Sequence, residues 1–243
     1  MKHLLCVVAT LTLIASPIQS AQAKPKGGDD FTAPKILFVT SEGYTGDLVG
    51  EAEALLGMPF ANGLEAADAI CQFHAALGGL DGDFVAMLST STVSAASRLT
   101  PTVGPYRRPD GVPVAAGLAG LFSTRLENVA GPAINLISSP NVDESGNAVV
   151  GPEARAWTGT RPMGHLDHAQ GGGPFSGAPF PEKSFCNEWT DNTQPALSGC
   201  LNSDPENTLP CGLSGRVGST GTSWAHDEYI ACHAILRLYC AER

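Results

Sequence analysis

Two cysteines near the C-terminus, Cys232 and Cys240, constrain the fold more than any other feature of the chain. Between them the sequence "HAILRLY" alternates, with Ala234, Leu236 and Leu238 on one face, which is typical of a half-buried β-strand. On such a strand the two cysteines share a face and lie about 26 Å apart at ~3.3 Å per residue, too far to bond to each other. Each cysteine therefore pairs elsewhere in the chain, or both are free thiols in a core.

The N-terminal segment predicts export. "MKHLLCVVATLTLIASPIQSAQA" has a short basic start, an apolar run too short to span a bilayer, and a small-residue ending. We expect a signal peptide over residues 1–23, cleaved near Ala23, and no lipoprotein, because Cys6 lies at the front of the apolar run. A polar linker over residues 24–34 and one domain over residues 35–243 follow. The mature protein is expected to be periplasmic or extracellular, where disulfides form.

Six cysteines remain after the signal peptide, and an even number in an exported chain favours three bridges. Sequence alone leaves 15 ways of pairing them. A structural zinc site is the alternative, but the chain has no C-x-x-C pair. Free thiols in the core are the other alternative, and export disfavours them. The six are Cys71, Cys186, Cys200, Cys211, Cys232 and Cys240.

The charge of the chain excludes a class of partners. Its formal net charge is −10, from 24 acidic and 14 basic residues. Loss of residues 1–23 removes only Lys2, so the mature chain carries −11. Such a surface repels polyanions, and Arg107 and Arg108 are the only adjacent basic pair. We therefore expect no nucleic-acid binding, no heparin binding and no membrane insertion.

Local patterns predict an α+β fold rich in loops, in keeping with 28 glycines and 18 prolines. The segment "NGLEAADAICQFHAAL" (62–77) predicts a helix, with Asn62 and Glu65 as a capping box and Cys71 on the core stripe. Residues 42–59 are expected to form a long loop. Strands are expected over residues 35–41, 83–90 and 184–190, besides the terminal strand.

The series "ADAICQFHAALGGLDGDFVAMLST", "FCNEWT", Trp224 and "CHAILRLYCAE" resembles endostatin, the C-terminal fragment of certain basement-membrane collagens. The segments "FVTSEGYTGDL", "RRPDGVPVA", "WTGT" and "LYCAE" look more like a family of exported bacterial domains of unknown function that carry this endostatin-like pattern. The resemblance covers roughly residues 35–242.

This resemblance implies a C-type-lectin-like fold with two nested bridges, Cys71–Cys240 and Cys186–Cys232. Cys200 and Cys211 have no counterpart in endostatin and would pair with each other. The zinc site of endostatin does not carry over, because no histidine occurs between Lys24 and His74. Its heparin-binding arginine cluster is absent as well.

Two segments are candidate sites for a bound metal. "GHLDH" offers His165, Asp167 and His168 as zinc ligands, against the alternative of a solvated glycine-rich loop. "WAHDEY" places Asp227 and Glu228 after Trp224, near where C-type lectins hold calcium, against the alternative of a core tryptophan beside acidic surface. No G-x-S-x-G nucleophile motif occurs. We expect no cofactor, with zinc or calcium as the alternatives.

We therefore expect a secreted, disulfide-stapled recognition module without enzymatic activity, suited to adhesion to a glycan or a matrix or cell-surface protein. The alternative is a small secreted hydrolase with a metal or carboxylate site near His165–His168. Metal analysis and mutation of these histidines separate the two, since only a metallo-hydrolase depends on them.

Overall fold

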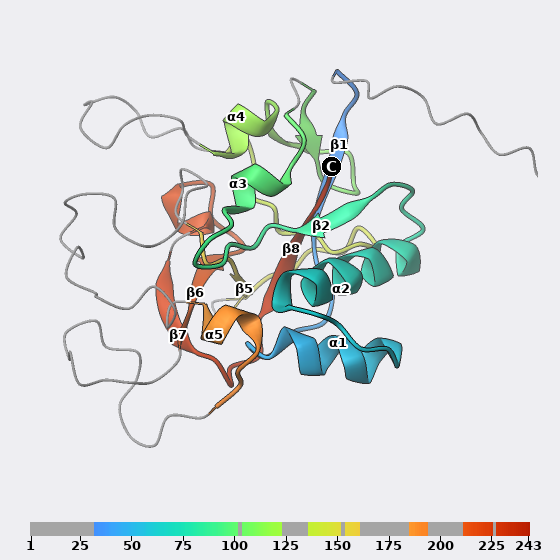
Figure 1. Ribbon diagram of the computed structural model, residues 1–243. Coiled ribbons are helices and arrows are strands. Elements are labelled where there is room, and N and C mark those ends of the chain that lie inside the picture. Colours follow the sequence, from blue (N-terminus) through green and yellow to red (C-terminus); the bar gives the residue numbers. More distant parts are fainter. Residues whose placement is uncertain are drawn as a thin grey trace, which may run out of the picture. The chain divides into compact units, whose positions relative to one another are not determined.

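The C-terminal strand β8 (Arg237–Glu242) lies at the centre of a mixed sheet in the computed structural model (Figure 1). Strand β1 (Lys35–Val39) pairs antiparallel along one edge of β8. Two strands share its other edge: β2 (Phe84–Ala86) runs antiparallel and β5 (Arg155–Trp157) runs parallel. The chain is thus a mixed α/β protein whose last strand joins elements from along its whole length.

The structure describes residues 32–101, 104–122, 136–151, 154–160, 185–193, 211–225 and 227–243, and residues 31–243 form one compact unit. The sheet runs in the order β4-β3-β1-β8-β5-β6-β7, with β2 beside β8. The other elements are α1 (Leu48–Leu56), α2 (Gly63–Leu77), α3 (Ala95–Arg98), β3 (Tyr106–Arg107), β4 (Pro113–Ala115), α4 (Leu118–Leu121), α5 (Cys186–Trp189), β6 (Cys211–Arg216), the 3-10 turn η2 (Thr222–Trp224) and β7 (Glu228–Ala231).

The terminal strand differs from the half-buried strand that we predicted. It begins only at Arg237, and Cys232 lies in the turn after β7, so the two cysteines are not on one continuous strand. From Leu238 to Ala241 every residue of β8 is buried. Alternation along a strand predicts one apolar face, but a strand paired on both edges and covered on both faces buries the polar-looking positions too.

The sheet separates two apolar clusters. On β1 and β8 the alternate residues Phe38, Leu238 and Cys240 face the cluster that α1 and α2 cover. The intervening residues, such as Leu37 and Tyr239, face a second cluster that includes side chains of α3 and α4. Figure 1 shows α1 and α2 together at the lower right, beside β8 and β2, and α3 and α4 at the upper left.

The helix predicted over residues 62–77 is confirmed as α2. Asn62 caps it, and its side-chain oxygen accepts a hydrogen bond from the Glu65 backbone N–H at 2.9 Å. The Glu65 carboxylate reaches back to the N–H of Ala61 rather than of Asn62. The long loop predicted over residues 42–59 is wrong, because α1 lies within it, capped by Asp47 and ended by Gly57 at φ +69°.

The strand predicted over residues 184–190 is also wrong, and the one predicted over residues 83–90 is shortened to β2. Residues 186–189 form a single helical turn, α5, with positive φ at every residue. Residues 87–90 continue from β2 as buried irregular chain.

Two disulfides join β8 and the turn before it to the rest of the unit. Cys71 of α2 bonds Cys240 of β8 across 169 residues, and Cys186 bonds Cys232 across 46. These are the two pairs that the endostatin-like resemblance implies. Cys211 is also disulfide-bonded, and Cys200, the partner expected for it, lies outside the described residues.

Candidate functional site

Four polar side chains form a continuous network, in which Tyr44, His74 and Glu144 are buried and Ser41 is partly exposed. The hydroxyl of Tyr44 lies 2.5 Å from Nε2 of His74, and Nδ1 of the same imidazole lies 2.9 Å from Oε1 of Glu144. The hydroxyl and the backbone N–H of Ser41 both donate to the Glu144 carboxylate, the latter at 2.9 Å. His74 is 1% exposed and Glu144 is 3% exposed, so the charged group of this network is almost wholly removed from water.

Three separate segments bring these side chains together. Ser41 and Tyr44 follow β1, and His74 comes from the last turn of α2. Glu144 comes from the tight turn after Val142, which the Asp143 side chain closes by accepting from the N–H groups of residues 145 and 147. The network therefore ties a strand end, a helix end and a turn into one unit.

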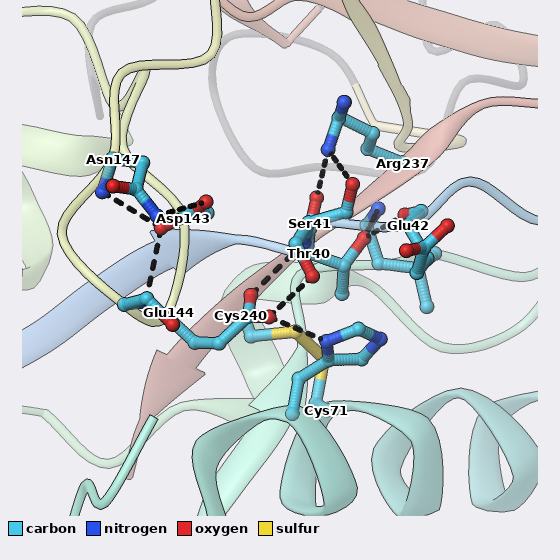
Figure 2. Close-up of polar contacts among 12 residues, drawn as sticks. Thr40, Ser41, Glu42, Cys71, Asp143, Glu144, Asn147, Arg237 and Cys240 are labelled. Carbon is cyan, nitrogen blue, oxygen red and sulfur yellow. Dashed lines mark hydrogen bonds and ion pairs between the residues drawn. A yellow bond between two sulfur atoms is a disulfide. The ribbon is translucent and has the colours of Figure 1, made fainter. Parts of the chain in front are cut away.

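Two further contacts set the geometry of the network. Gly78 ends α2 against the turn, where an added Cβ would lie 2.3 Å from the Glu144 carbonyl oxygen, so only glycine permits this approach. The guanidinium of Arg237 donates to the carbonyl oxygens of Thr40 and Ser41, the former at 2.6 Å. Figure 2 shows the contacts of Arg237 with Thr40 and Ser41 together with the Cys71–Cys240 bridge.

The surroundings hold Glu144 in its charged form. Burial alone raises the pKa of a carboxyl, but here the hydrogen bonds from His74 and Ser41 outweigh burial and lower the pKa of Glu144 to about 2. The ionised carboxylate only accepts, so Nδ1 of His74 carries a proton. In the neutral imidazole, Nε2 then accepts from the Tyr44 hydroxyl.

The same surroundings keep Tyr44 protonated. Burial raises the pKa of its hydroxyl well above the ordinary value, and the nearby charges of Glu42, Glu144 and Glu51 raise it further. A tyrosinate is therefore strongly disfavoured at this position.

The order of groups resembles a catalytic triad only in part. In a serine triad the nucleophile donates to the imidazole and the carboxylate binds the other ring nitrogen. Here Ser41 bonds to the carboxylate, and the group in the position of the nucleophile is Tyr44, a buried phenol whose pKa is raised. Such a phenol is a poor nucleophile, and the observed hydrogen bonds link the three segments.

A second unusual feature is the left-handed turn α5. The four residues Cys186–Trp189 have φ angles of 47°, 51°, 58° and 66°, in the region that favours glycine, yet none is glycine. Each left-handed non-glycine residue costs roughly 1–2 kcal/mol, somewhat less for asparagine. A run of four persists only where the surrounding contacts impose it.

Contacts on three sides impose this turn. Cys186 is bonded to Cys232, and the buried indole of Trp189 donates from Nε1 to the carbonyl oxygen of Ser89 at 2.7 Å. The Glu188 carboxylate accepts from the backbone N–H of Ser91 at 3.2 Å. The turn is thus fixed at its first, third and last residues, while Asn187 is exposed.

The two candidate metal sites lie in different parts of the chain. His165, Asp167 and His168 lie outside the described residues, so that prediction stays a prediction. Among the residues that the structure does describe, no three His, Cys, Asp or Glu side chains come together as a metal site.

The segment after Trp224 does not offer free calcium ligands. Trp224 is buried and packs against Phe122 and Tyr239, with ring centroids 5.9 and 5.7 Å apart, as a core tryptophan does. Asp227 accepts from Arg155 at 2.8 Å and from Arg216 at 3.2 Å. Glu228 lies 2.5 Å from the same arginine, Arg155. Both carboxylates are committed to ion pairs.

Sequence reasoning named neither His74 nor its partners Ser41, Tyr44 and Glu144 as candidate site residues. A weak signal was present, because "SEGY" and "DESG" are short polar clusters, the first at the end of the strand predicted over residues 35–41. Nothing local indicates that these clusters meet, since Glu144 is 70 residues from His74 and 103 from Ser41.

Neither the family models nor the curated proteins with which the chain was compared give a match. Within the part of the chain that the structure describes, no helix combines the length and the apolar character needed to cross a bilayer.

Proposed function

We propose that this protein is an extracellular recognition module with an endostatin-like, C-type-lectin-like fold. The observation that carries the proposal is the pair of disulfides that hold the C-terminal segment. Cys240 is bonded to Cys71 of helix α2, and Cys232 is bonded to Cys186 of the turn α5. Disulfides of this kind persist in oxidising compartments outside the cytoplasm. They favour a rigid scaffold that presents its surface unchanged to a partner.

The use of the polar groups in the core supports binding over catalysis. The Ser41–Glu144–His74–Tyr44 network is closed, with each group committed to another and the phenol kept protonated. The carboxylates beside Trp224 are likewise paired with arginines. These groups support the scaffold, and the ligand is expected to meet exposed residues instead.

The charges favour a neutral or basic ligand over a polyanion. The chain has a net charge of −10, and the guanidinium of Arg108 is already bonded to Asp110 at 2.6 Å and to Asn141 at 2.8 Å. Arg107 donates to the carbonyl oxygen of Gly111. We propose that the ligand is a neutral glycan or a protein surface of the matrix or of a cell.

A binding array tests this proposal. The exported protein is applied, unreduced, to immobilised neutral glycans, sulfated glycans and extracellular-matrix proteins, with a reduced and alkylated sample as the control for fold dependence. We expect saturable binding to a neutral glycan or a matrix protein that reduction abolishes. Hydrolysis of any arrayed substrate by the native sample alone would contradict a purely binding role.

A further inference from the structure

The Cys71–Cys240 and Cys186–Cys232 disulfides join different kinds of backbone structure. Cys71 lies in the middle of a regular right-handed helix, and Cys240 lies in the middle of a strand paired on both edges. Cys186 begins a left-handed turn, and Cys232 lies in the turn between β7 and β8. The first bridge thus reaches the centre of the sheet, and the second joins two turns.

Strain is concentrated at only one of the bridges. Among the described residues, the only non-glycine residues with positive φ are the four of the turn Cys186–Trp189. Since a left-handed conformation is unfavourable for an L-residue, the chain on that side relaxes once the constraint is removed. No such backbone conformation lies next to Cys71 or Cys240.

We propose that the Cys186–Cys232 disulfide is a redox-sensitive lock on the left-handed turn. Its reduction lets residues 186–189 leave the left-handed region and withdraws Trp189 from its bond to Ser89, while the Cys71–Cys240 bridge and the sheet remain. This inference concerns the scaffold and does not depend on which ligand the protein binds.

The reductant is a dithiol, such as a thiol-disulfide oxidoreductase or dithiothreitol. A thiolate of the dithiol attacks one sulfur of the bridge, forms a mixed disulfide and expels the other sulfur as a thiolate. The second thiol of the reductant then displaces the remaining cysteine. The bridge takes up two electrons and two protons to become two thiols, and the dithiol becomes a disulfide.

Both bridges are buried, so the order of reduction reports local opening. Cys71, Cys186, Cys232 and Cys240 are all 0% exposed, and a thiolate reaches them only when the chain around them opens. When opening and closing are fast, the rate of reduction follows the population of the open form. Strain in the closed turn raises that population at Cys186 but not at Cys71.

The experiment is reduction of the folded wild-type protein by dithiothreitol at neutral pH. Samples are alkylated at intervals and the labelled cysteines are identified by peptide mass mapping, while tryptophan fluorescence is followed in parallel. We expect Cys186 and Cys232 to be labelled before Cys71 and Cys240, together with a change in fluorescence, while far-UV circular dichroism is retained. Labelling of Cys71 and Cys240 first, or of all four at once as the fold is lost, would overturn the proposal.

Substitutions at Asn187 test whether strain is the cause. Its side chain is exposed, its φ is 51°, and it bonds only to Thr190 among the described residues. Asn187→Gly removes the steric cost of the left-handed conformation, whereas Asn187→Val increases it, because a β-branched residue fits that region poorly.

We expect Asn187→Gly to slow the labelling of Cys186 about two- to fivefold and Asn187→Val to speed it by a similar factor. Neither substitution should change the labelling of Cys71. The matched control is Ala76→Gly, at an exposed position of the right-handed helix α2, where glycine should not slow labelling of either bridge. Equal labelling rates in the glycine and valine variants would show that strain in the turn does not control the lock.

Discussion

Glu144 and His74, 70 residues apart, form a buried ion pair or hydrogen bond with 2.9 Å between Oε1 and Nδ1, and neither side chain is more than 3% exposed. The carboxylate also satisfies two donors of Ser41. Buried donors that lose their acceptor are costly, because water cannot replace it. The contact is therefore expected to stabilise the fold, unlike an exposed ion pair.

Removal of this carboxylate should destabilise the protein. Glu144→Ala leaves Nδ1 of His74 and two donors of Ser41 unpaired, and we expect a loss of about 3 kcal/mol in the free energy of unfolding. The matched control is Glu42→Ala, an exposed carboxylate nearby, which should change stability by less than about 0.5 kcal/mol. Urea unfolding measures both, and equal effects of the two substitutions would refute the anchoring role.

The dependence of stability on pH follows from the same residue. The pKa of Glu144 falls from its ordinary 4.5 to about 2 on folding, so the folded state binds this proton more weakly than the unfolded state. Its contribution is fully present above about pH 4.5 and is lost as the pH falls toward 2, on the order of 2 kcal/mol in all.

A comparison of wild type with Glu144→Gln reports this contribution, because acidic groups that are not in contact with Glu144 titrate alike in both proteins. Asp110, whose pKa is lowered by the hydrogen bond from Arg108, is one of them. We expect the difference in unfolding free energy to shrink between pH 4 and pH 2.5. A difference that stays constant down to pH 2.5 would show that Glu144 is not held ionised by its partners.

Local patterns predicted the elements whose structure is decided locally. Helix α2 was foreseen because Asn62 caps it and because its apolar residues recur at helical spacing. Helix α1 was missed because only Leu48 and Ala52 of its nine residues are buried, so it has almost no apolar stripe. The signal available was Asp47 before it and Gly57 after it.

The left-handed turn α5 could not be read from the sequence, since "CNEW" has no glycine to mark positive φ. Its conformation is imposed by Cys232, Ser89 and Ser91, which lie far away in the chain. The polar network likewise depends on contacts between segments that are distant in the sequence. Its members are ordinary residues in their own segments, and only the sheet topology brings them within hydrogen-bond distance.

Calcium should not stabilise the protein through the segment after Trp224. Asp227 and Glu228 are engaged by Arg155, and Asp227 also by Arg216, so a cation at this position would have to displace two guanidinium groups. We expect the same melting temperature, within about 1 °C, in millimolar calcium and in excess EDTA. The control is Arg155→Ala, which frees Glu228 and leaves Asp227 paired with Arg216 alone. A calcium-dependent rise in wild type that Asp227→Asn abolishes would contradict this expectation and restore the calcium site.

Heparin should not be retained at physiological salt. Heparin binding requires a local cluster of positive charge, because at physiological ionic strength charges are screened beyond about 8 Å. The one adjacent basic pair, Arg107 and Arg108, is partly neutralised, since Asp110 holds the guanidinium of Arg108 and lies beside the pair.

Asp110→Asn therefore serves as the matched variant, as it releases this guanidinium without adding a charge elsewhere. We expect wild type to pass through a heparin column at 150 mM salt and Asp110→Asn to be retarded slightly, if at all. Tight retention of wild type that is lost on replacing Arg107 and Arg108 with alanine would show that the fold assembles a polyanion site around this pair.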